Sequence, residues 1–347
     1  MKGHPLDVDP KTVADIGEFG LIDRIQKILP AVKHEDVLIG IGDDTAVIKI
    51  DAHRAWLVTC DIQVEDQHFR LQNISPYQLG RRAMAVNLSD IAAMGGKPTF
   101  ALVSLGFPKS LPLSDFENLF KGMGDQLAEF STIIIGGNLS NTANKMIIDI
   151  TLLGEVSPKQ FLTRSGAKAG DRIFVTGNLG ASGAGFYLLE KYGRNYPTEF
   201  DDLVQKHLQP IPRIEVGQRI AQSGFGTAMI DVSDGIASDL NHICKMSGVG
   251  AEIYQNKLPL PNNLIKITSL TGKSALHLAL HSGEDYELLF TARPEIPDSL
   301  FDSITKDTGV PITEIGRILP QDFGYYLIDR HGEKSPIQPK GWDHFSK

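Results

Sequence analysis

The chain has 347 residues, of which 41% are apolar and 22% are charged, and its formal net charge is −8. This length suits two domains, and the composition is that of a globular protein rather than a disordered or fibrous one. Acidic residues outnumber basic ones by 42 to 34, and no run of Lys or Arg occurs, which argues against nucleic acid as a partner.

The cysteines and the apolar runs indicate the cellular compartment of the protein. Cys60 and Cys244 are far apart in the sequence, so neither a disulfide framework nor a zinc site is indicated. Residues 1–10 carry charges and prolines instead of a basic segment followed by an apolar one. No apolar stretch approaches the roughly 20 residues that span a bilayer. We therefore predict a soluble, cytoplasmic protein.

The first half of the chain mixes short strand-like runs with helical ones. A helix is predicted after Ser75, which is a good N-cap, with Pro76 at its first position and Gly95-Gly96 as its terminator. A second helix is expected over 115–129. The strands are expected at 56–60, 100–105, 133–135 and 146–154.

The segment 157–171 lacks apolar periodicity and contains Pro158, Gly166 and Gly170, so it predicts a domain boundary. We place one domain at 1–156 and the other at 157–347, both of α/β (α+β) class. The second domain is expected to contain strands at 172–176, 227–230 and 286–291 and helices at 184–192, 199–208 and 238–247.

The most informative pattern is a series of acids beside short apolar runs. Asp44 follows Gly42-Asp43, Asp61 is expected to end the strand that begins at Leu57, and Asn87 and Asp90 share one helix face. The second half adds Asp231, Asp234, Asp239, Glu284 and Asp285. Each acid alone is explained by a turn or a helix cap, and Asn87 with Asp90 by a buried hydrogen-bond network. Convergence on one cleft explains all of them together.

Such a cleft would suit magnesium, which prefers oxygen ligands and leaves positions open for substrate phosphates. Several bound cations would reduce the repulsion between ATP and a second phosphorylated substrate.

Glycine motifs are less informative. Residues 271–274 resemble the end of a P-loop, but Ile267 stands where the motif requires glycine. The run 175–185 could face phosphate or simply pack a helix against a sheet.

With these motifs in view, the chain resembles the thiamine-monophosphate kinase family from beginning to end. The matching segments are 17–22, 42–44, 86–94, 162–168, 230–235, 283–288 and 340–345. The resemblance implies the ATP-binding superfamily of aminoimidazole-ribonucleotide synthetase, with an N-terminal domain that forms a homodimer through its sheet. It also implies ATP-dependent phosphorylation of thiamine monophosphate to thiamine diphosphate.

The resemblance further implies roles for individual residues. The expected Mg²⁺ ligands are Asp44, Thr59, Cys60, Asp61, Asp90, Asn138, Asp231 and Asp234, of which Asp44, Asp61, Asp90, Asp231 and Asp234 would serve catalysis through the bound metal. The expected ATP contacts are Gly136, Gly137, Asn138, Arg164 and Ser233, and the expected substrate contacts are His68, Glu284 and Trp342. Asn138 departs from the family, because many members have Asp there, and the metal loses a charged ligand.

Two alternatives remain open at this point. Another member of the superfamily would share the fold, although the cysteine-dependent members do not match a chain that ends Phe345-Ser346-Lys347. A non-catalytic sensor of thiamine phosphates or nucleotide would bind ATP without turnover. For the kinase, the absence of a nucleophile motif predicts direct in-line transfer between the two phosphates.

Overall fold

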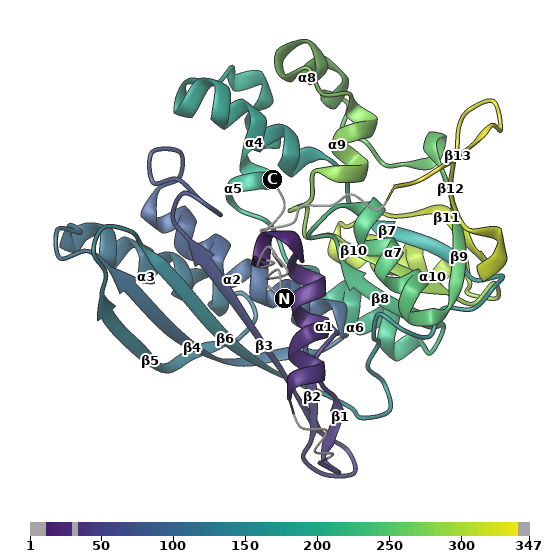
Figure 1. Ribbon diagram of the computed structural model, residues 1–347, viewed down its shortest axis with the longest axis horizontal. Coiled ribbons are helices and arrows are strands. Elements are labelled where there is room, and N and C mark those ends of the chain that lie inside the picture. The colour runs from purple at the N-terminus through teal and green to yellow at the C-terminus, as the bar shows by residue number, and fades with distance from the viewer. Residues whose placement is uncertain (1–11, 30–33, 339–347) are drawn as a thin grey trace, which may run out of the picture.

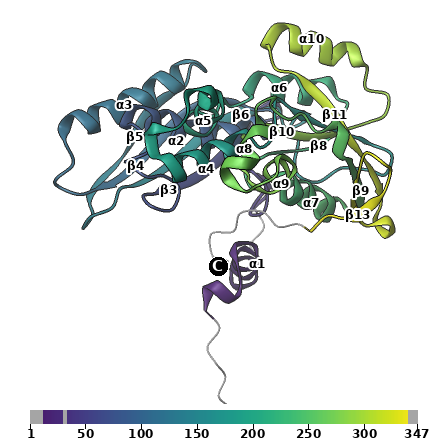
Figure 2. The ribbon, with the colours of Figure 1, turned by 90° about the horizontal axis from the view of Figure 1, so that it is seen from above.

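The computed structural model describes residues 12–29 and 34–338 and shows two α/β units side by side (Figures 1 and 2). The first unit consists of η1 (Val13–Asp15), α1 (Glu18–Ile28), β1 (Val37–Ile39), β2 (Ala46–Lys49), β3 (Ala55–Val64), α2 (Pro76–Ala93), β4 (Lys97–Phe107), α3 (Leu113–Ala128), β5 (Ile133–Asn141) and β6 (Ile147–Val156).

The second unit begins after the segment 157–171. It consists of β7 (Arg172–Thr176), α4 (Ala181–Tyr192), η2 (Gly193–Asn195), η3 (Thr198–Phe200), α5 (Asp201–Leu208), α6 (Ile214–Ser223), β8 (Gly226–Asp231), α7 (Ile236–Ser247), β9 (Val249–Tyr254), η4 (Gln255–Lys257), α8 (Leu264–Thr271), α9 (Ala275–His281), β10 (Leu288–Ala292), α10 (Asp298–Thr308), β11 (Ile312–Pro320), η5 (Gln321–Phe323), β12 (Tyr325–Ile328) and β13 (Lys334–Pro336). The predicted fold class is confirmed, whereas the division after residue 156 stays a prediction.

The sheet of the first unit has the strand order β1-β2-β3-β6-β4-β5, and in it only the β4–β5 pair is parallel. Helices α2 and α3 lie on one face of this sheet (Figure 2). The long strand β3 pairs with β6 from Ala55 opposite Val156 to Val64 opposite Ile147. The prediction that Asp61 ends this strand is therefore wrong, because the pairing with β6 carries β3 three residues further.

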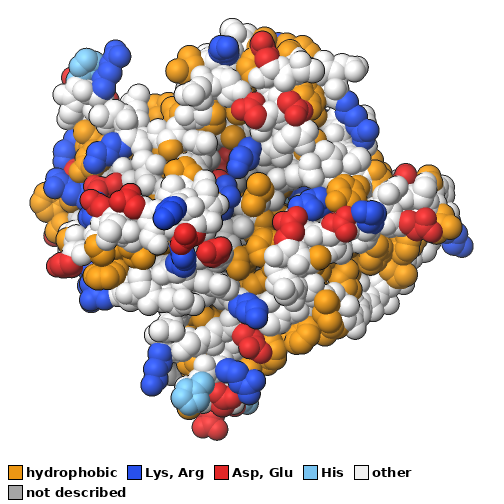
Figure 3. Space-filling model, turned by 180° about the vertical axis from the view of Figure 1, so that it is seen from behind, with side chains coloured by type: hydrophobic (Ala, Val, Ile, Leu, Met, Phe, Trp, Pro, Cys, Tyr) orange, Lys and Arg blue, Asp and Glu red, His pale blue; other side chains and the backbone are white. Residues whose placement is uncertain are grey.

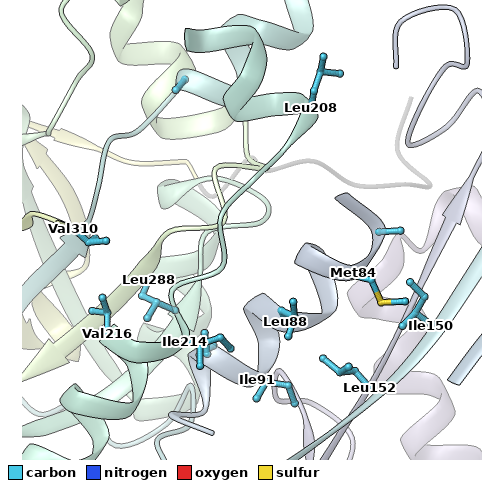
Figure 4. Close-up of a cluster of buried hydrophobic side chains, with 14 of the residues drawn as sticks. Met84, Leu88, Ile91, Ile150, Leu152, Leu208, Ile214, Val216, Leu288 and Val310 are labelled. Carbon is cyan, nitrogen blue, oxygen red and sulfur yellow. The ribbon is translucent and has the colours of Figure 1, made fainter. Parts of the chain in front are cut away.

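Helix α2 occupies the centre of the molecule. It starts as predicted, because the hydroxyl of Ser75 accepts from the backbone N–H of Gln78 at 3.3 Å and Pro76 takes the first position. Its side chains Met84, Leu88 and Ile91 lie between those of β6 and those of the second unit (Figure 4). Each of these three is fully buried and contributes about 1.5–3 kcal/mol relative to an exposed side chain.

Two glycines allow α2 and α3 to cross closely. A Cβ at Gly80 would lie 2.0 Å from the carbonyl oxygen of Leu119, and one at Gly122 would lie 2.0 Å from that of Tyr77. Any larger residue at either position would force the two helices apart. The crossing therefore fixes α2, and with it every side chain that α2 directs toward the second unit.

The second sheet has the strand order β13-β12-β9-β11-β7-β10-β8, with β9 and β12 parallel. Strand β7 has the predicted bounds, but β10 begins at Leu288 rather than at the predicted residue 286. Tyr286 has a φ of +48°, a left-handed conformation that a strand cannot contain. The turn that precedes β10 is thus longer than the sequence pattern indicates.

The described part of the chain has no helix long and apolar enough to cross a membrane. On the face seen from behind, acidic and basic side chains are interspersed over the surface (Figure 3). That face offers no continuous basic stripe for a nucleic-acid backbone.

Candidate active site

A cavity of about 690 Å³ lies between the two units. Helix α1 contributes Glu18 and Ile22 to its wall. The rest comes from the β1–β2 turn, β3 and the loop after it, α2, the segment between the two units, β8, α7 and the turns beyond β8 and before β10. The sequence-predicted residues that line this cavity are Asp44, Thr59, Cys60, Asp61, His68, Asp90, Arg164, Asp231, Ser233, Asp234 and Glu284. The two halves of the chain thus bring most of their acidic motifs to one place. Asp285 is an exception, because its carboxylate accepts from the backbone N–H groups of Gly180 and Ser182 at 2.6 and 3.0 Å and does not line the cavity.

Three carboxylates form the centre of the acidic group. Asp44 comes from the turn after Gly42, whose φ of +122° favours glycine, Asp90 comes from α2, and Asp231 ends β8. One carboxylate oxygen of each lies within 4.8 Å of the others. This spacing suits oxygen ligands around a shared divalent cation.

Each of two central acids accepts a hydrogen bond from a hydroxyl. The hydroxyl of Thr59 donates to Asp90, and that of Ser89 donates to Asp231 Oδ2 at 2.7 Å. Burial, followed by the neighbouring Asp61 and Asp231 charges, raises the pKa of Asp90 well above its usual range. Burial and the Asp44 charge raise the pKa of Asp231 to about 8. The hydroxyls therefore offset only part of the cost of gathering these acids.

Arg164 supplies a positive charge inside the cavity. Its Nε and Nη2 atoms donate to Asp44 Oδ1 at 2.9 and 2.5 Å, and its backbone N–H donates to Asp43 at 3.2 Å. Even so, burial raises the pKa of Asp44, and Asp44 Oδ2 has no hydrogen-bond partner among the described residues. A buried carboxylate oxygen without a hydrogen-bond partner, in a residue that lies close to two other acids, is the feature that a bound Mg²⁺ would explain.

Asn87 is accounted for without a ligand. Its side-chain amide donates to the carbonyl oxygen of Ala83 at 3.2 Å, and its oxygen accepts from the backbone N–H of Asp61 at 3.3 Å. The alternative of a structural network is therefore correct for Asn87. Burial raises the pKa of Asp61 to about 6, so this residue shares the electrostatic cost of the acidic group.

A smaller, partly aromatic pocket adjoins the cavity. It is lined by Phe186 and Tyr187 of α4 and by His281 and Ser282 at the end of α9. The substrate candidates His68 and Glu284 line both this pocket and the acidic cavity, and Gln67 and Gly183 complete the pocket. A ligand with an anionic end and a ring could therefore occupy both compartments at once.

Some predicted site residues do not face the cavity in this chain. Gly136, Gly137 and Asn138 lie in β5, and they are absent from the cavity wall among the described residues. Gly137 has a packing explanation, since a Cβ there would lie 1.8 Å from the carbonyl oxygen of Val103. Trp342 lies outside the described residues.

Cys60 lines the cavity, but its thiol has another partner. The Sγ atom donates to Asp149 Oδ1 at 3.0 Å. Side chains alternate along β3, so this thiol points away from the face on which its neighbours Thr59 and Asp61 meet α2. A contribution of Cys60 to metal binding would therefore come from its backbone.

The site also contains residues that were not among the predicted contacts. Asp43, Asp239 and His242 line the cavity, and Arg82 lies next to Glu284. Asp43 and Asp239 belong to acidic motifs that are visible in the sequence, but only the fold shows that they line the cavity. Arg82 could have been noticed in the sequence, because it is a cation within the predominantly apolar helix α2.

Comparisons with known proteins identify the class to which the two domains belong. Residues 42–156 match the N-terminal domain of AIR synthase related proteins, and residues 168–327 match the C-terminal domain of that family. The solved structure of the hydrogenase maturation protein complex HypE–HypF has a TM-score of 0.69 at 16% identity, which supports the fold alone. Fold and site together define a protein of the AIR synthase-related class.

Relatives of higher sequence identity identify the family within this class. Thiamine-monophosphate kinase from Aquifex aeolicus is 38% identical over 331 residues, covering 95% of this chain and 99% of the relative. The enzyme from Escherichia coli K12 is 37% identical, covering 95% and 98%. The structure of AaThiL complexed with AMPPCP and TMP has a TM-score of 0.83 at 36% identity and covers 97% of this chain and 99% of that one. The chain belongs to the thiamine-monophosphate kinase family.

Proposed function

We infer that this protein is a thiamine-phosphate kinase, which uses ATP to phosphorylate thiamine monophosphate to thiamine diphosphate. Family membership supports this function, and one observation in the structure carries it. The buried acids Asp44 and Asp231 and the half-buried Asp90 meet in a cavity whose wall continues into a partly aromatic pocket. Such a site can hold phosphates at one end and the rings of thiamine at the other.

We propose direct in-line transfer. A terminal phosphate oxygen of thiamine monophosphate attacks the γ-phosphorus of ATP, and the bond to the β–γ bridging oxygen breaks, so that its electron pair leaves with ADP. The attacking oxygen is already ionised at neutral pH, and no side chain needs to remove a proton from it. The cavity residues would act by positioning the two phosphates and excluding water.

We propose Asp44, Thr59, Asp61, Asp90, Asp231 and Asp234 as the residues that hold Mg²⁺, with Cys60 taking part through its backbone. Their fit rests on the orphaned Asp44 Oδ2 and on the spacing of the carboxylates. Bound Mg²⁺ supplies charge neutralisation for the phosphates. Arg164 and Ser233 line the same cavity and are proposed as ATP contacts, whereas His68 and Glu284 are proposed for thiamine monophosphate.

We propose that Gly136, Gly137 and Asn138 contribute to ATP and metal binding only in a homodimer. The face of the first sheet opposite α2 and α3 carries exposed apolar side chains, among them Ile62 and Leu102, and Ile135 of β5 is exposed as well. A partner chain on this face would bury them and cover β5. Light scattering at micromolar concentration tests this, because a monomer mass would contradict the proposal.

The cytoplasm remains the proposed location.

The activity is tested with purified protein, ATP, Mg²⁺ and either thiamine or thiamine monophosphate, with ADP release followed and the product weighed by mass spectrometry. Thiamine diphosphate is expected from the monophosphate alone. Binding of ATP without any product would favour the sensor. A phosphorylated enzyme that forms and decays at the rate of turnover would contradict direct transfer.

A further inference from the structure

The acidic cavity and the aromatic pocket meet at Glu284, whose partly exposed carboxylate pairs with the buried guanidinium of Arg82. Arg82 of α2 is only 1% exposed, and its guanidinium donates from Nη2 to the carboxylate of Glu284 and from Nη1 to the carbonyl oxygen of His207. A buried guanidinium is costly without a neutralising partner. Arg82 and Glu284 therefore depend on each other.

Glu284 sits in an unusual backbone conformation. Its φ is +56°, and those of Gly283 and Tyr286 are +64° and +48°. Only glycine adopts this region freely, so the turn must be held by its surroundings. Backbone hydrogen bonds do part of this, because the N–H of Glu284 donates to the carbonyl oxygen of Ser233 at 2.8 Å. Arg82 holds the side chain itself.

The surroundings also keep Glu284 charged. Burial would raise the pKa of Glu284, but the charge of Arg82, the largest opposing influence, holds this pKa below its usual value. Burial and Arg82 lower the pKa of His207 to about 4, so His207 is neutral at neutral pH. Its Nδ1 atom lies 3.4 Å from Glu284 Oε2 and 3.1 Å from Ser182 Oγ. Arg82 therefore supplies the permanent positive charge.

We propose that Arg82 is a positioning residue for the substrate ring, which fixes the Glu284 carboxylate at the entrance of the aromatic pocket to receive the cationic thiazolium of thiamine monophosphate. The proposal rests on the proposed function. Glu284 lies on the walls of both compartments, so a substrate with its phosphate among the acids passes its ring beside this carboxylate. Phe186 and Tyr187 add aromatic side chains to the same pocket, and aromatic faces also attract a cation.

Ser282 gives the pocket a further unsatisfied polar group. Its hydroxyl oxygen is buried without a hydrogen-bond partner among the described residues, and Ser282 is part of the pocket wall. A buried hydroxyl of this kind is normally paired. A ring nitrogen or amino group of the bound substrate would pair it, which fits the same orientation of the ligand.

The test is steady-state kinetics of Arg82→Gln with thiamine monophosphate and with its thiophene analogue, in which a neutral ring replaces the thiazolium. The KM for thiamine monophosphate should rise about tenfold or more, because a charge-assisted contact is lost. The KM for ATP should change less than about twofold, since Arg82 does not line the acidic cavity proposed for the triphosphate. The preference of the wild-type enzyme for the cationic ring should disappear.

Two further variants keep the test decisive. Arg81→Gln is the matched control, since Arg81 adjoins Arg82 on α2 but pairs with Glu129 at the surface, and it should retain wild-type constants. Arg82→Lys retains the charge with fewer donors, should fall between Arg82→Gln and wild type, and provides the folded variant if Arg82→Gln does not fold.

The proposal is overturned if folded Arg82→Gln keeps the preference for the cationic ring, or if the KM values for ATP and thiamine monophosphate rise together. Where Arg82→Gln does not fold, an Arg82→Lys variant with the full wild-type preference overturns it. Glu284→Gln should lose the same preference, and adding Arg82→Gln to it should raise the KM for thiamine monophosphate little further. If the wild-type protein makes no thiamine diphosphate, the proposed function itself fails, which is a different result.

Discussion

Glu287 and the acids of the cavity differ in how completely their carboxylates are paired. Glu287, which directly precedes strand β10, is 1% exposed, accepts from Arg213 at 2.6 and 2.5 Å and accepts from Thr176 at 2.6 Å. The acids of the cavity share Arg164, and their pKa values are raised. A carboxylate with a structural role is fully paired. Acids that remain underpaired inside a cavity have the arrangement that a cation-binding site requires.

The largest expected effect separates function from folding in the cavity. Asp90→Asn should lower kcat by about 1000-fold or more, because a charge that organises the phosphates is lost. The same change should leave the metal-free protein as stable as before or more stable, since Asp90 is strained by neighbouring acids. Kinetics and thermal melts without metal check both halves.

Asp125→Asn is the control for that experiment, because Asp125 is exposed on α3 and bonds to Tyr77 and Lys121 away from the cavity. Its activity should be unchanged. If Asp90→Asn prevented folding without metal, Asp90 would belong to a structural network like that of Asn87, and the contrast with Glu287 would disappear.

The next effect tests the paired group. Arg213→Gln should destabilise the protein by about 3–5 kcal/mol, because it leaves Glu287 buried without its counter-charge. Arg219→Gln, on helix α6, which Arg213 directly precedes, removes a more exposed pair with Asp307 and should cost less than about 1 kcal/mol. Urea denaturation measures both values. Equal losses would show that burial does not distinguish the two pairs.

The smallest effect is a dependence of stability on pH. The pKa of Asp231 is about 8 and that of Asp43 is about 7, whereas an unfolded Asp titrates near 4. The folded, metal-free protein therefore holds more protons between pH 4 and 8, and its stability should fall by about 2 kcal/mol or more as the pH rises from 5 to 8. Urea denaturation at both pH values checks the direction.

Added Mg²⁺ should reverse most of that loss at pH 8, because a ligand that binds only the folded state stabilises it. In Asp231→Asn the fall with pH should be smaller. A metal-free protein that became more stable toward pH 8 would show that the cavity acids are paired in a way that their geometry does not reveal.

Much of the site could be predicted from the sequence because its acids belong to short local motifs. The turn at Gly42-Asp43-Asp44, the helix face with Asp90 and the strand end at Asp231 are all set by neighbours in the chain. The pairing of Arg82 with Glu284 spans 202 residues, and only the fold reveals it. Likewise, the extent of β3 beyond Asp61 depends on β6, which the local pattern does not contain.

The placement of α2 has a consequence for how the protein unfolds. Leu88 and Ile91 belong to the same apolar cluster as Ile214 and Leu288 of the second unit, and a Cβ at Gly217 would lie 2.1 Å from the carbonyl oxygen of Ala92. If either half unfolds, apolar side chains of this helix become exposed to solvent. The two halves should therefore melt in one cooperative calorimetric transition, and either half expressed alone should expose an apolar surface and aggregate.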